Sequence, residues 1–125
     1  MANESRELWL AEMIDILGVD REDVLEVAAM FFDTIDERLT ASTRAFHGGD
    51  LKELTRLIHG LKGDAANIGF KKISQLARVL EMQSREGGVI DFDVQFAALQ
   101  NAVAAQKQTL DLDNVALDDG PGPSV

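Results

Sequence analysis

The hydrophobic residues of this chain recur at intervals of three and four, which is the spacing of one face of an α-helix. No segment alternates polar and apolar residues as a half-buried strand does, so strands are not expected. Glycine-containing breaks divide the pattern into five helical segments. These are Glu4 to Leu17, Asp20 (as cap) to about Phe46, Asp50 (as cap) to the corner at Asn67–Phe70, a fourth helix that follows this corner and ends near Gly87–Gly88, and a last helix that starts at Asp91 or Asp93.

Short polar side chains mark where these helices begin. Asp20 is expected to cap the second helix, and the helix dipole favours Asp23 in its first turn. Asp50 is followed three residues later by Glu53, which is the pattern of a capping box. Gly69 is expected to end the third helix.

The short links between these helices favour antiparallel neighbours. We therefore predict an all-α fold, an up-and-down antiparallel four-helix bundle with an additional N-terminal helix. Trp9 and the six phenylalanines are expected to pack in the core or at its edge. The other expected core residues are Leu10, Met13, Ile14, Leu17, Val24, Val27, Ala28, Ile35, Leu39, Leu54, Leu57, Ile58, Leu61, Ala65, Ile68, Ile73, Leu76, Ala77, Leu80, Met82, Leu99, Val103 and Leu110.

At 125 residues the chain has the length of a single domain. Residues 111–125 differ from the rest, because they contain several acids, the run Gly-Pro-Gly-Pro and few large apolar side chains. We expect residues 1–110 to form the bundle and residues 111–125 to be a disordered tail or a linker.

Composition excludes several classes of protein. The chain has no cysteine, which excludes disulfides and thiolate metal sites. A net charge of −10 argues against a nucleic-acid partner. No apolar run approaches the roughly 20 residues needed to cross a bilayer. The first residues, Met-Ala-Asn-Glu-Ser-Arg, do not have the apolar core of a signal peptide, so we expect a cytoplasmic protein with no membrane partner.

His59 is the candidate for chemistry, because helical geometry directs it away from the core. The apolar residues from Leu54 to Ile68 fall in an arc of about 120°, and His59 lies roughly 150° from the centre of that arc. A lone histidine in a helix is usually structural, but this one is expected to be surrounded by cations and small side chains. Its expected neighbours on the outer face are Lys52, Thr55, Arg56, Lys62, Gly63 and Ala66.

Gly63 costs the helix about 1 kcal/mol relative to alanine, so its place on an exposed face needs a reason. We interpret it as open space through which a second molecule reaches the imidazole. Neutral imidazole is a good nucleophile near physiological pH. Arg56 and Lys62 attract an incoming phosphoryl group, although exposed charges contribute only about 1 kcal/mol or less. The pattern predicts an exposed nitrogen nucleophile for a phosphoryl group.

Basic residues are concentrated around His59. Between Leu51 and Arg78 they outnumber the acids, which are Glu53 and Asp64. Such a patch on an acidic chain favours docking against an acidic site, although an ordinary fluctuation of helix-surface charge is an equal alternative. The basic residues are Lys52, Arg56, Lys62, Lys71, Lys72 and Arg78.

Other signatures are absent from the sequence. His47 stands at a helix end, where capping is the expected role, and it is too far from His59 in sequence to indicate a zinc site. There is no Walker loop, Gly-rich nucleotide loop or kinase signature. We therefore expect no metal, no cofactor, no ATP site and no autonomous enzyme activity.

The segment His59-Gly-Leu-Lys-Gly63, followed by Ala65-Ala66 and Gly69, resembles the signature of histidine-containing phosphotransfer (HPt) domains. These are the helical-bundle modules of phosphorelays. The resemblance implies that His59 accepts phosphate at Nε2, that Lys62 is the assisting lysine and that Gly63 is the small residue beside it. Asp64 departs from the Ser or Ala usual in the family and is expected to weaken the local positive field.

The resemblance also implies the partners. These are a response-regulator receiver domain with a phosphorylatable aspartate, a hybrid histidine kinase, or both, with Mg²⁺ on the receiver only. His59 would carry the phosphoryl group between receiver aspartates, and Lys52, Thr55, Arg56 and Ala66 would contact the partner. A monomer is expected. Two alternatives stay open: the phosphoacceptor domain of a chemotaxis-type histidine kinase, and a non-catalytic helical-bundle adaptor in which His59 is incidental.

Overall fold

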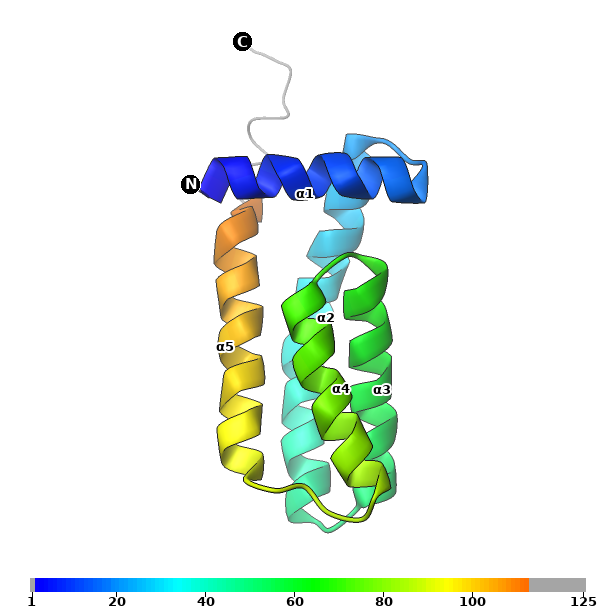
Figure 1. Cartoon of the computed structure of the whole chain (residues 1–125), viewed down its shortest axis with the longest axis vertical. Helices are drawn as coiled ribbons and strands as arrows, with labels where there is room; N and C mark the ends of the chain where they lie inside the picture. Colours follow the sequence, from blue (N-terminus) through cyan, green and yellow to red (C-terminus); the bar gives the residue numbers. More distant parts are fainter. Residues whose placement is uncertain (1, 113–125) are drawn as a thin grey trace.

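A computed structural model describes residues 2–112 of the chain, and all five expected helices are present in it (Figure 1). The described residues contain no strand, so the all-α prediction is confirmed. The prediction of a disordered tail falls almost entirely on residues 113–125, which lie outside the described part. The helices are α1 (Ala2–Leu17), α2 (Arg21–His47), α3 (Leu51–Asn67), α4 (Lys71–Arg85) and α5 (Phe92–Leu110).

Helices α2 to α5 run side by side along the long axis of the molecule, and α1 lies across one end of them (Figure 1). α3 packs against α2 on one side and α4 on the other, while α5 packs against α4. α1 contacts α2 and α5. The arrangement is the predicted four-helix bundle with an additional N-terminal helix.

The helix caps follow the sequence signals, with one exception. The carboxylate of Asp20 accepts a hydrogen bond from the backbone N–H of Asp23 at 2.9 Å, and Asp50 accepts one from Glu53 at 3.1 Å. The capping box is only half formed, because the carboxylate of Glu53 binds Arg56 at 2.6 and 2.7 Å instead of reaching back to Asp50. A charged guanidinium one turn later is a stronger partner than a neutral backbone N–H.

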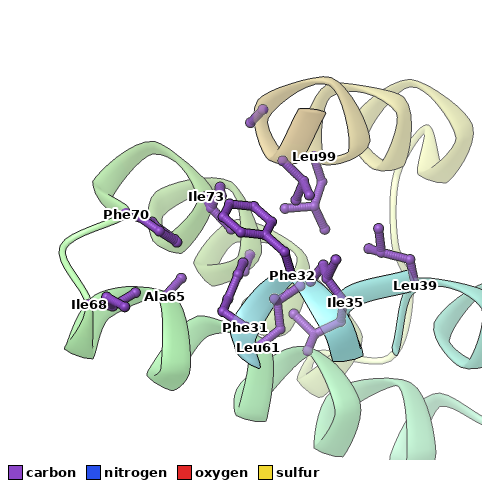
Figure 2. Close-up of a cluster of buried hydrophobic side chains, with 14 of the residues drawn as sticks. Phe31, Phe32, Ile35, Leu39, Leu61, Ala65, Ile68, Phe70, Ile73 and Leu99 are labelled. Carbon is purple, nitrogen blue, oxygen red and sulfur yellow. The ribbon is translucent and has the colours of Figure 1, made fainter. Parts of the chain in front are cut away.

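Phe70, at the corner between α3 and α4, is the largest fully buried side chain of the core. Its ring centroid lies 5.1 Å from that of Phe31 and 5.5 Å from that of Phe32, both on α2 (Figure 2). The ring of Trp9 stacks on Phe70 at 5.6 Å. Trp9 itself is buried, as expected, so α1 contributes to the same core.

Three residues expected in the core are exposed: Leu17, Val27 and Met82. Val27 lies about 75° from the centre of the buried arc of α2, at its edge. Met82 lies on the face of α4 opposite its buried stripe. Leu17 is the last residue of α1, where the helix reaches the edge of the bundle. An apolar side chain alone does not fix burial at such positions.

Candidate functional site

His59 lies on the outer face of α3, with its side chain 60% exposed. The opposite face of α3 is fully buried through Leu54, Ile58, Leu61 and Ala65. The prediction that the imidazole faces outward is therefore confirmed.

The ring is held by a glutamate that the sequence interpretation missed. Glu81, on α4, is almost fully buried, and its Oε2 lies 2.7 Å from Nδ1 of His59. Its Oε1 lies 2.6 Å from Nζ of Lys62. Arg85, one turn further along α4, donates to Oε2 from Nη2 at 2.6 Å and from Nε at 3.1 Å. We refer to His59, Lys62, Glu81 and Arg85 as the Glu81 cluster.

The charge state of Glu81 follows from these contacts. Burial by itself raises the pKa of this carboxyl, but hydrogen bonds from Lys62, Arg85 and His59 outweigh burial and hold the pKa at about 2. At neutral pH Glu81 is therefore a carboxylate, which accepts hydrogen bonds and donates none.

A carboxylate at Nδ1 fixes the tautomer of the imidazole. Since Glu81 only accepts, Nδ1 of His59 carries the hydrogen of their 2.7 Å bond. In the neutral ring the lone pair is then on Nε2, the other ring nitrogen. The contact at Nδ1 therefore leaves Nε2 as the ring nitrogen whose lone pair is free.

Gly63 leaves open space beside the ring. A Cβ atom built at this position meets no other atom within 4 Å, and the backbone has no positive φ that would require glycine. Neither packing nor backbone conformation accounts for this glycine. Access for a second molecule remains the explanation we favour, and its functional role stays a prediction.

Two of the expected neighbours of the imidazole point elsewhere. Both contacts of Arg56 go to Glu53, and its side chain is 69% exposed. Thr55 faces α4, where its Oγ1 lies 2.5 Å from Oγ of Ser84. Helical geometry gives the direction of a Cβ atom, not the partner that a long or polar side chain chooses. Lys52 and Ala66 are exposed on the outer face of α3.

The charges around the site are more balanced than the sequence suggests. Asp64 lies on the α2 side of α3, where its carboxylate pairs with Arg38 at 2.6 Å. The arginine thereby offsets the negative charge that Asp64 was expected to add near His59. Lys62 is likewise bound to Glu81, so the basic patch carries less free positive charge than its composition indicates.

The tight corner at Gly69 brings His59 and Glu81 together. His59 lies ten residues before Gly69 and Glu81 twelve after it, so two antiparallel helices place them at similar height. A signal for Glu81 existed in the sequence, because it adjoins the apolar stripe of α4, where an unpaired carboxylate is rare. Arg85 at the i+4 position was a further sign.

Within residues 2–112 no group of three His, Cys, Asp or Glu side chains is placed to hold a metal ion. In the same part of the chain, no helix has the length and apolar character to span a bilayer. His47 is the last residue of α2, and its ring meets those of Phe46 and Phe92 edge-on.

The family model described as "Hpt domain" matches residues 26–109, which include the whole Glu81 cluster. No curated protein and no solved structure matches the chain significantly. The family match covers well over half of the chain, and the fold is the expected helical bundle. The protein therefore belongs to the Hpt family, the phosphotransfer domains of two-component signalling.

Proposed function

We propose that the protein is a phosphorelay intermediate that carries a phosphoryl group on Nε2 of His59 between the aspartates of receiver domains. One observation carries the proposal most directly: an exposed imidazole whose Nδ1 is held by a buried carboxylate. An adaptor in which His59 is incidental has no need of this arrangement.

The transfer step uses the lone pair of Nε2. It attacks the phosphorus of an aspartyl phosphate, the P–O bond to the aspartate breaks, and the electron pair leaves with the carboxylate. The ring then carries both the phosphoryl group and the hydrogen on Nδ1, and is positive. Glu81 stabilises this positive ring through the hydrogen bond at Nδ1. The reverse sequence passes the group to the next aspartate.

The protein supplies the nucleophile and its orientation, while the receiver supplies the rest. Positioning and electrostatics dominate phosphoryl transfer. We propose that Mg²⁺ is held by the acidic pocket of the receiver, and that Lys62 assists electrostatically from its place beside the ring. Lys52 and Ala66, exposed on the same face, are proposed partner contacts, as is Arg56.

A groove beside α3 extends the proposed receiver surface. It is lined by side chains from α1, α2 and the end of α3, and the ion pair of Arg38 with Asp64 stands at its rim. Gly60 and Gly63 lie between this groove and His59, so one partner can cover the groove and the imidazole together. Apolar lining residues are Leu17, Val27, Met30, Phe31 and Ile68.

Phosphotransfer from a labelled receiver domain to the wild type and to His59→Gln tests the proposal. Labelling of the wild type alone supports it, and equal labelling of both proteins overturns it. Labelling by an ATP-charged histidine kinase with no receiver present would instead favour the phosphoacceptor domain of a chemotaxis-type kinase.

A further inference from the structure

Arg85 shares an oxygen with the imidazole. Its Nη2 and Nε donate to Oε2 of Glu81, the same atom that accepts from Nδ1 of His59, while Lys62 binds Oε1. The side chain of Arg85 is 58% exposed, and its guanidinium adds nothing to the core. The i,i+4 pair joins this exposed guanidinium to the buried carboxylate of Glu81. Its place in the cluster suggests another role.

Two donors on one oxygen compete for its negative charge. The guanidinium of Arg85 neutralises part of the charge that Glu81 presents to the ring, because opposite charges at hydrogen-bond distance interact strongly. Without Arg85, Nδ1 would face a more negative carboxylate. The hydrogen on Nδ1 would then be held more firmly whenever the ring is positive.

That hydrogen decides how easily a phosphoryl group leaves Nε2. When the P–N bond of phosphohistidine breaks, the electron pair returns to Nε2. A ring with a hydrogen on Nδ1 leaves as neutral imidazole, whereas a ring without one must leave as an imidazolate anion, a far poorer leaving group. The protonated fraction of the phosphorylated ring therefore sets the rate at which water or an aspartate takes the phosphoryl group.

We propose that Arg85 is a positioning residue that sets the lifetime of the phosphohistidine by limiting the negative charge of Glu81 at Nδ1; this rests on the proposed function of His59. Within residues 2–112, the charged groups that contact the ring or its carboxylate partner are Lys62 from α3, and Glu81 and Arg85 from α4. Arg56, one turn before His59 on α3, is paired with Glu53. Arg85 favours storage of the phosphoryl group over its loss.

The test phosphorylates the full chain with phosphoramidate, a small donor that needs no partner protein, and follows hydrolysis by ³¹P NMR between pH 6 and pH 9. In Arg85→Ala we expect hydrolysis at pH 8 to be about three to ten times faster. The rise of the rate with falling pH should begin about 0.5 to 1 pH unit higher. Arg85→Lys should fall between Arg85→Ala and the wild type, because it keeps the charge but not the double contact.

Arg78→Ala is the matched control. It removes the same charge from the exposed surface of α4, one turn before Glu81, whose described partners are His59, Lys62 and Arg85. Its hydrolysis profile should follow the wild type. Equal lifetimes and equal pH profiles for Arg85→Ala and the wild type, with both folded by circular dichroism, would overturn the role of Arg85 alone. Failure of the wild type to accept phosphate on His59 from phosphoramidate and from a receiver would overturn the proposed function as well.

Discussion

Oε2 of Glu81 lies 2.7 Å from Nδ1 of His59, although the two residues belong to different helices. This contact joins the exposed face of α3 to the edge of the buried stripe of α4. It fixes the ring tautomer and directs the free lone pair to Nε2. The site is therefore built across two helices, and the packing of α3 on α4 is part of the chemistry.

Glu81 makes stability depend on pH in a defined direction. Its pKa in the folded protein is about 2, below its ordinary value of 4.5, so its contribution is present above about pH 5 and is lost as the pH falls toward 2. The pKa difference corresponds to at most about 3 kcal/mol. Urea denaturation between pH 2 and pH 7 should show a shallower decline for Glu81→Gln than for the wild type. Parallel curves for the two proteins would contradict the charge state assigned to Glu81.

Replacing Gly63 should show that this glycine is not needed for folding but is needed for a receiver to reach His59. Gly63→Ala is expected to raise the free energy of unfolding by up to about 1 kcal/mol, because the site is helical and open. Gly63→Gln should also fold, but it should slow transfer from a receiver by about tenfold or more, since misplacement of the reacting groups by about 1 Å has costs of that order. Stopped-flow transfer assays measure this rate.

The small donor phosphoramidate supplies the control for Gly63→Gln. It reaches the imidazole without a protein surface, so it should phosphorylate the variant at nearly the wild-type rate. If transfer from the receiver and from phosphoramidate slowed to the same extent, the substitution would have damaged the site itself. Unchanged transfer from the receiver would remove the argument that this glycine provides access.

Gly69 should be intolerant of any side chain. Its φ of +77° is costly for other residues, and an added Cβ would lie 2.7 Å from Cε of Met13 on α1. We expect Gly69→Ala to lower the free energy of unfolding by about 1 to 3 kcal/mol. Fluorescence of Trp9, the only tryptophan, reports the transition in urea. Gly88→Ala, at an open position with an ordinary φ, is the control and should be neutral or slightly stabilising.

Helical periodicity was enough to predict the five helices and the outward direction of His59, because both depend only on spacing along one helix. It did not predict the Glu81 cluster. That cluster depends on how α4 is rotated against α3, which periodicity within one helix does not determine. Periodicity also did not give the hydrogen-bond partners of Thr55 and Arg56, which are Ser84 and Glu53.

The central claim is that Nε2 of His59 carries the phosphoryl group. The most direct measurement is transfer from a ³²P-labelled receiver domain to the wild type and to His59→Gln, followed by acid and alkali treatment of the product and mapping of the labelled peptide. We predict label that is acid-labile, stable in alkali, confined to the peptide with His59 and absent from His59→Gln. Label on another peptide of the wild type, or equal labelling of the variant, would contradict the account.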